Sequence, residues 1–275
     1  MPSETNVLGD SVEYVLTSAL RAASDQDPVY VVGPTPAIVE ALVTRAIDVD
    51  DSPPVRVLAT EELLKSATDD FLVASNASDL LASGALDLRI VDDPPDNPLV
   101  VTESSIVAVV TVGDRAAGLS TQDDGLVDTA ADTYAEQFAA AREFSLRTPA
   151  LSDVRTSLEQ DLGADIREEF DAVLAALETV QDGRAELDEV TISLLVAARN
   201  EVLLYDISKW GEDVGIASKA TFSRTKTKLE ERGLLKTEKV PIDVGRPRLR
   251  LSLADDRLRE ADVADLAAVA RDLLD

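Results

Sequence analysis

The sequence contains no cysteine and no histidine among its 275 residues. Without cysteine there is no disulfide framework, thiol nucleophile or thiolate metal site. Without histidine, the commonest general base and the usual zinc and iron ligand are missing, which excludes the Ser/His/Asp triad and paired-histidine phosphodiesterases. We therefore expect no metal, no cofactor and no catalytic residue, and predict that the chain is not an enzyme.

Long hydrophobic runs are missing as well. No stretch approaches the length of about eighteen apolar residues that a membrane helix needs. The first residues, Met1-Pro2-Ser3-Glu4, lack the basic segment and apolar core of a signal peptide. These two absences predict a cytoplasmic protein that does not bind membranes.

Basic and aromatic residues are scarce. The chain has 26 Lys and Arg against 53 Asp and Glu, a net charge of -27, and its aromatic content is 4%. The acids are spread along the chain, as in organisms that keep molar salt in the cytoplasm, where salt screens the repulsion within a dense carboxylate surface. The acidity therefore indicates a halophilic habitat more than a function. The 45% of apolar residues predicts a globular protein, long enough for two domains.

The first half of the chain alternates predicted strands and helices. The β-branched run Val29-Tyr30-Val31-Val32 ends at Gly33, and Thr35 can then cap a helix. Ile106–Val110 is apolar on both faces, which is typical of a central strand covered by helices. Further strands are expected over residues 55–58, 86–91, 99–102 and 106–112, and helices over 7–23, 60–64, 78–82 and 125–146. The pattern predicts an α/β N-terminal domain with a central sheet covered by helices.

A long apolar stripe follows over residues 151–180, at spacings of three and four and weakened by Gly163. Such a helix either packs on its own sheet, which is the commoner case, or forms a dimer. A linker is expected at Gln181-Asp182-Gly183-Arg184. We predict an α/β sensor-like domain over residues 1–146, a linking and possible dimerisation helix over 147–183, and a second domain over 184–275.

The second domain carries a basic segment in this acidic chain. From Lys219 to Arg250 there are ten Lys or Arg and four Asp or Glu, a local net charge of +6. The whole chain has a net charge of -27, so the rest of the chain carries -33. Charges separated in this way orient a protein toward a polyanion. The segment therefore predicts double-stranded DNA as a partner.

The predicted elements of this domain are short and are bounded by capping and turn residues. Asp206 is expected to cap a second helix that ends at Gly215, and Ser218 a third. A hairpin follows, with Gly245-Arg246-Pro247-Arg248 at its turn. The first helix is expected over residues 188–199 and the two hairpin strands over 234–240 and 248–253, with Leu249, Leu251 and Leu253 inward and Arg248 and Arg250 outward.

One face of the third helix is suited to reading DNA. Phe222 and Leu229 face the core, so Ala220, Arg224 and Thr227 point away from it. An Arg can grip guanine through two hydrogen bonds, and a methyl group can contact thymine. The basic turn of the hairpin suits insertion into a minor groove. The predicted DNA-binding residues are Ser218, Lys219, Ala220, Ser223, Arg224, Thr227, Lys228, Arg246 and Arg248.

Residues Ile207 to Leu253 resemble a winged helix-turn-helix DNA-binding domain. Over its full length, from Val29-Tyr30-Val31-Val32-Gly33 to Tyr205 through Arg250, the chain resembles the TbsP family of haloarchaeal transcriptional regulators, suppressors of the sugar-responsive regulator TrmB. The resemblance implies an α/β domain, then helices and a C-terminal winged helix-turn-helix. It further implies a cytoplasmic homodimer at promoters of central carbon metabolism that senses a metabolite, such as a sugar or sugar phosphate.

The sequence also predicts a ligand site in the first domain. The candidate residues are Gly33 and Thr35 at a strand-to-helix turn, Ser75 and Asn76, and Ser104, which would line one crevice at the ends of strands or helices. The alternative is that Thr35 is only a helix cap and the other residues belong to ordinary turns.

Three alternatives to a DNA-binding regulator stay open. The cations can simply solvate a helix and a hairpin or pair with the acidic body. The second domain can dock another regulator as a protein-interaction adaptor. A sugar-phosphate-handling enzyme fused to a DNA-binding domain is a more remote alternative.

Overall fold

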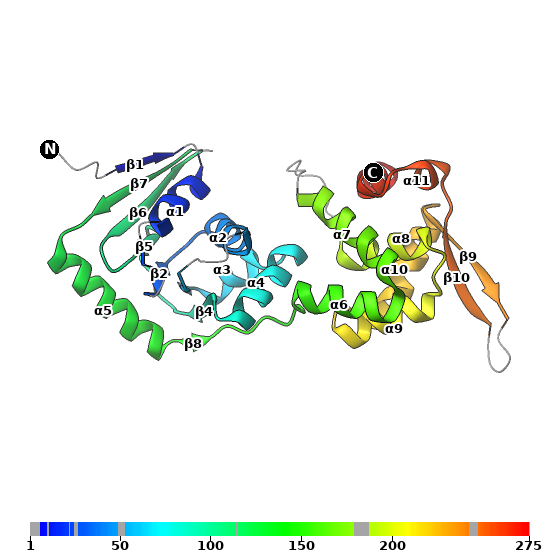
Figure 1. Ribbon diagram of the computed structural model, residues 1–275, viewed down its shortest axis with the longest axis horizontal. Helices are drawn as coiled ribbons and strands as arrows, with labels where there is room; N and C mark the ends of the chain where they lie inside the picture. Colours follow the sequence, from blue (N-terminus) through cyan, green and yellow to red (C-terminus); the bar gives the residue numbers. More distant parts are fainter. Residues whose placement is uncertain are drawn as a thin grey trace. The chain divides into compact units, whose positions relative to one another are not determined.

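The chain folds into two compact units, Met1–Leu146 and Arg147–Asp275. The computed structural model describes residues 6–9, 11–21, 23–24, 27–48, 53–113, 115–178, 187–241 and 247–274 (Figure 1). Within these ranges, no helix combines the length and the apolar character needed to cross a membrane. The expected linker at residues 181–184 lies outside the described residues.

The first unit is built on one mixed sheet. Its strands are β1 (Asn6–Gly9), β2 (Val29–Val32), β3 (Val55–Ala59), β4 (Leu86–Ile90), β5 (Leu99–Val101), β6 (Ile106–Val112), β7 (Arg115–Thr121) and β8 (Arg142–Glu143). They lie in the order β1-β7-β6-β5-β2-β3-β4-β8. The central strands β2, β3 and β4 are parallel, and the other pairs are antiparallel. The predicted fold class is confirmed, as a mixed rather than a uniformly parallel sheet.

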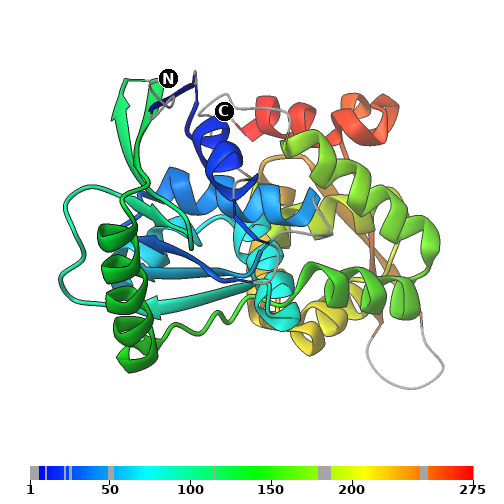
Figure 2. The same cartoon turned by 60° about the vertical axis from the view of Figure 1, so that its left-hand side comes forward.

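Helices cover the two faces of this sheet unequally. On one face lie α1 (Val12–Arg21), α2 (Pro36–Asp48), α3 (Glu61–Ala67) and α4 (Phe71–Ser83), whose buried side chains form the main core with the central strands. On the other face α5 (Asp124–Ala140) packs over β2 and β5 (Figure 2). There the rings of Phe138 and Tyr30 pack edge to face, with 6.0 Å between their centroids.

The expectation that β6 is covered on both faces is wrong. Val107 and Val109 are buried, but Val110 and Val112 on the same strand are 39% and 76% exposed. The reason is that α5 packs mainly over β2 and β5 and meets β6 at Ile106, near the start of that strand, whereas Val110 and Val112 lie further along it.

Other elements of the first unit also differ from the predictions. The first described element is the strand β1, and the helix expected from residue 7 starts only at Val12. The strands β7 and β8 were not predicted. The helix expected over residues 78–82 is the longer α4, which starts after Asp70 because that carboxylate accepts a hydrogen bond from the N–H of Val73 at 2.8 Å.

The second unit is helical with one hairpin. Its elements are α6 (Leu151–Leu162), α7 (Ala164–Glu178), α8 (Glu189–Arg199), α9 (Leu204–Val214), α10 (Lys219–Glu231), the hairpin β9 (Leu235–Val240) and β10 (Arg248–Leu253), α11 (Asp256–Glu260), the 3-10 turn η1 (Val263–Asp265) and α12 (Leu266–Leu274). Its core includes Trp210, Phe170 and Phe222, each at most 1% exposed. The rings of Phe170 and Trp210 pack edge to face, with 6.5 Å between their centroids. The last three elements were not predicted from the sequence.

The stripe expected as one helix over 151–180 is two helices. Gly163 ends α6 with a φ of 109° and a ψ of 160°, a backbone conformation that glycine accepts without strain. Val154 and Phe170 on the two helices are buried, α6 packs against α9, and α7 packs against α8. The indole N–H of Trp210 on α9 donates to Ser157 Oγ on α6 at 3.0 Å. Much of the apolar stripe is therefore used inside the second unit.

Candidate nucleic-acid interface

Helices α9 and α10 are joined by a tight turn whose residues are visible in the sequence. Gly215 ends α9 in the left-handed region, with a φ of 92°. Ser218 caps α10, because its hydroxyl oxygen accepts a hydrogen bond from the N–H of Thr221 at 3.2 Å. Where the two helices cross, Gly211 lies so close to Phe222 that a Cβ would come within 2.3 Å of the ring. A glycine here allows the two helices to pack closely.

Asp206 does not cap α9, contrary to the prediction. The cap position is Leu203, which has no side-chain hydrogen bond, and Asp206 lies in the first turn of the helix. The cap was misplaced because Leu203 and Leu204 carry no local start signal. The chain before α9 is instead fixed by a β-bridge between Leu203 and Arg250 of the hairpin.

The face of α10 turned away from the core is exposed. Phe222 and Leu229 are 0% and 3% exposed and hold the helix to the core. On the opposite side, exposed side chains present small, hydroxyl-bearing and basic groups: Ala220, Ser223, Arg224, Thr227 and Lys228. Five of the nine predicted DNA-binding residues thus share one surface, which we call the α10 face.

Hydrogen bonds already shape part of the α10 face. The guanidinium of Arg224 donates to Thr221 Oγ1 at 3.3 Å, one turn earlier on the helix. The Thr227 hydroxyl donates back to the carbonyl oxygen of Ser223 at 3.0 Å. An Arg held by a single long hydrogen bond keeps most of its five donors for another partner.

Other cations of the basic segment are paired. The Lys219 ammonium lies on the Glu212 carboxylate of α9, and this hydrogen bond raises the pKa of Lys219 and lowers that of Glu212. Lys226 pairs with Glu230 at 2.7 Å, and its side chain is only 12% exposed. Burial alone would raise the pKa of Glu230, but hydrogen bonds from Lys226 and Thr237 outweigh it and lower the pKa. Glu230 is already counted in the local net charge of +6, whereas Glu212 lies outside the segment, so its pairing with Lys219 lowers the positive charge that this surface offers to a ligand.

The hairpin presents its cations differently from the prediction. Arg248 is half-buried, because its guanidinium stacks on the Tyr205 ring at 4.2 Å and lies 3.3 Å from the Asp206 carboxylate. The sequence predicted that Arg248 points outward but did not predict these contacts, which hold its side chain against α9. Arg246 lies outside the described residues. Lys236 and Lys239 are exposed on β9, a strand that contacts α10, and the sequence analysis assigned no role to them.

The candidate ligand residues of the first unit do not form one crevice. Gly33 follows β2 with a φ of 58°, its N–H donates to the Leu58 carbonyl oxygen at 2.9 Å, and a Cβ there would lie 2.7 Å from the Pro95 carbonyl oxygen. Thr35 Oγ1 accepts a hydrogen bond from the N–H of Ile38 at 3.4 Å, the geometry of a helix cap. The turn at Gly33 is thus closed by its own neighbours.

The remaining three candidates lie elsewhere. Ser75 and Asn76 are in the middle of α4, not at a helix end, and Ser75 is fully buried. Ser104 is in the turn after β5, a strand antiparallel to β2 with Val32 opposite Leu99 and Tyr30 opposite Val101. Because the register runs in that direction, this turn lies at the other end of β2 from Gly33.

Two short helices joined by a tight turn, with the second exposed along one face and followed by a hairpin, define a helix-turn-helix domain of the winged type. The comparisons with known families agree. A family model described as "Transcriptional regulator TbsP-like, N-terminal" matches residues 4–149, and one described as "Transcriptional regulator TbsP-like, C-terminal HTH domain" matches residues 150–271. The chain belongs to the TbsP-like transcriptional regulators.

More distant comparisons add little. One solved structure, described as "TrmBL2, an archaeal chromatin protein" with "a novel mode of DNA binding", is similar at 18% identity with a TM-score of 0.38. The similarity covers 52% of this chain and 55% of that chain, so the match spans about half of that chain's length. A likeness of this size carries no argument about function. No curated protein matches the sequence.

Proposed function

We propose that the chain is a sequence-specific DNA-binding regulator that reads the major groove with the α10 face. The observation that supports this most is the exposure of Ala220, Ser223, Arg224, Thr227 and Lys228 along one side of a helix whose other side is fixed in the core. An α-helix fits the major groove, where each base pair presents a distinct pattern of donors and acceptors. No catalytic role is part of the proposal.

Each residue of the α10 face has its own role in the proposal. Arg224 grips a guanine through two hydrogen bonds, and the Ala220 methyl group contacts a thymine. Ser223, Thr227 and Lys228 contact phosphates or base edges, which fixes the register of the helix. Ser218 and Lys219 lie at the N-terminus of α10, where backbone N–H groups favour an anion and the Lys219 N–H donates to Glu212, so a phosphate bound there would replace this carboxylate.

The hairpin provides the second set of DNA contacts in the proposal. Arg246 and Arg248 were both predicted to contact DNA, but Arg248 is held by Tyr205 and Asp206. We therefore assign Arg248 to positioning the hairpin against α9. Contacts with the backbone of the DNA come instead from Arg246 and from the exposed Lys236 and Lys239.

The finer assignments rest on the family. As a TbsP-like regulator, the chain acts, we propose, as a homodimer at promoters of central carbon or sugar metabolism genes, in a halophilic archaeon, in response to a metabolite. A dimer with two-fold symmetry predicts a pseudo-palindromic site whose halves lie about 10 base pairs, or a multiple of that, apart. The closed turn at Gly33 argues against the crevice expected in the first unit.

The test is a selection from random DNA by the full chain, followed by a shift assay on the selected site. Arg224→Ala should weaken binding to this site and relax the preference at one base pair, whereas Lys228→Ala should weaken selected and unrelated DNA alike. Lys209→Ala is the control, because Lys209 is exposed on α9 and paired with Asp213 at 2.6 Å. No enrichment of any sequence, or equal binding by wild type and Arg224→Ala, would overturn the proposal. Enrichment only in the presence of another regulator would favour the adaptor.

A further inference from the structure

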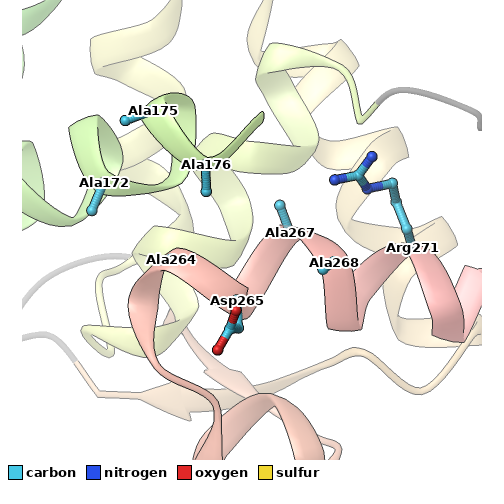
Figure 3. Close-up of a pocket in the computed structure, with 8 residues that line it drawn as sticks. All are labelled: Ala172, Ala175, Ala176, Ala264, Asp265, Ala267, Ala268 and Arg271. Atoms are coloured by element: carbon cyan, nitrogen blue, oxygen red, sulfur yellow. The ribbon is translucent and has the colours of Figure 1, made fainter. Parts of the chain in front are cut away.

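A hollow of about 440 Å³ lies within the second unit, between α7 and the segment formed by η1 and α12. Pockets that hold small metabolites have volumes of about 300–1,000 Å³. Two charged residues, Asp265 and Arg271, line the hollow, and Figure 3 shows them on either side of Ala267 on the same segment. The rest of the lining consists of small apolar side chains: Ala172, Ala175, Ala176, Ala264, Ala267 and Ala268.

Arg271 is the unusual residue of this hollow. It is only 8% exposed, and no described residue forms a hydrogen bond or an ion pair with its guanidinium. Among the described residues, the buried side-chain nitrogens without a hydrogen-bond partner are the Nε atoms of Arg45 and Arg167, so the Arg271 guanidinium is reached by solvent through the hollow. An anionic group in the hollow would therefore meet this cation, whose planar guanidinium can bind a carboxylate or phosphate through two hydrogen bonds.

Asp265 limits what the ligand can be. It is exposed and is the last residue of η1, six residues before Arg271 on α12. A second anionic group at that end would be repelled by the carboxylate, whereas a hydroxyl group could donate a hydrogen bond to it. The alanine walls between the two ends leave room for a short carbon chain.

We propose that this hollow binds a small polyol or hydroxy acid with a single phosphate or carboxylate group, which Arg271 holds. Neither the sequence prediction nor the family assignment places a ligand here. The predicted ligand residues all lie in the first unit.

The hollow is connected to the α10 face through hydrogen bonds to backbone carbonyl oxygens. Arg232, at the C-terminal end of α10, donates to the carbonyl oxygen of Leu274 in α12 at 2.7 Å. Arg199, at the end of α8, donates to the carbonyl oxygen of Ala261 before η1 at 2.9 Å. A ligand that shifts α12 relative to α7 therefore also shifts the end of α10. This effect on DNA rests on the proposed function, but ligand binding does not.

The experiment titrates the full chain with four probes by calorimetry: glycerol 3-phosphate, glycerate, inorganic phosphate and glycerol. Glycerol 3-phosphate or glycerate should bind at least about tenfold more tightly than inorganic phosphate, and glycerol should not bind. Arg271→Met should weaken binding by at least about tenfold without lowering the melting temperature, because it removes an unpaired charge. Ala268→Phe, which fills the hollow, should abolish binding. Arg257→Met is the matched control, since Arg257 is exposed on α11 and pairs with Asp255.

Two results would overturn the site: no binding of any probe at about 10 mM, or binding that neither Arg271→Met nor Ala268→Phe changes. A lower melting temperature in Arg271→Met would also count against it, because it would show that the guanidinium has a structural partner. The link to DNA is tested separately with Arg232→Met, which should bind the probe as wild type does but lose the effect of the probe on DNA affinity. If wild type bound the probe but no DNA, the proposed function would fail and the ligand site would stand.

Discussion

The crossing of α9 and α10 gives a prediction that can be worked out from the coordinates. In Gly211→Ala, the new Cβ would lie 2.3 Å from Cε2 and Cζ of Phe222, whereas carbon atoms in contact are about 3.5–4.0 Å apart. The ring must therefore retreat by more than about 1 Å. Phe222 is fully buried, so it has little free space to enter.

The expected change in stability is a balance of two effects. Overpacking a core costs about 1–3 kcal/mol, whereas replacing glycine by alanine within a helix gains up to about 1 kcal/mol. We expect a net loss of about 1–2 kcal/mol, because the displaced group is a fully buried ring. In a unit of this size that corresponds to a fall in melting temperature of about 3–10 °C.

The assay is thermal and urea unfolding of the full chain, followed by circular dichroism. Gly125→Ala in α5 is the matched control, since its Cβ would meet only Asp123 Oδ1, at 3.6 Å, and the same substitution should leave stability unchanged or slightly higher. A displaced Phe222 should also tilt α10, so DNA affinity should fall with stability. Wild-type stability and wild-type DNA affinity in Gly211→Ala would refute the close contact between α9 and α10.

Three further predictions concern charge. Asp206→Asn removes the ion pair with Arg248. The free energy of unfolding in urea should change by less than about 1 kcal/mol. The DNA affinity should rise, and the slope of log affinity against log salt concentration should steepen by about one released counterion. Hydrogen bonds first from Lys65 and then from Arg142 lower the pKa of Glu61 from 4.5 to about 2, so any stability it contributes is present above pH 4.5 and is lost as the pH falls toward 2. An NMR titration should find that Arg142→Gln raises this pKa, and an unchanged value would contradict the pairing. Because the net charge is -27, the free energy of unfolding should rise with added KCl, and a decrease would exclude self-repulsion as a major effect.

The strands that could be predicted from the sequence are those whose residues favour a strand by themselves. β2 and β6 are runs of β-branched residues, and both were found with their bounds correct. β7, with the sequence RAAGLST, has few such residues and forms a strand because β6 and β1 lie on either side of it. Such pairing depends on distant parts of the chain, so no local pattern could reveal it.

The same distinction holds for the candidate site. The cap at Ser218 and the exposed side of α10 follow from local signals and helical periodicity, and the structure has both. The pairing of Arg248 with Asp206 depends on how the hairpin packs on α9, which spacing along the chain does not determine. The hollow at Arg271 was missed for a similar reason, since alanines on two helices carry no signal until the helices meet.

The most direct test of the central claim uses the absence of cysteine from the chain. Ala220→Cys places a single thiol on the α10 face, and Ala164→Cys places one at the exposed start of α7. Each variant is mixed with the selected DNA site carrying a disulfide-tethered base in the major groove. We predict that Ala220→Cys cross-links to one or two base positions in each half-site and that Ala164→Cys does not cross-link. Equal cross-linking of the two variants, or none from Ala220→Cys on DNA that the chain binds, would contradict the assignment of α10 as the helix that reads DNA.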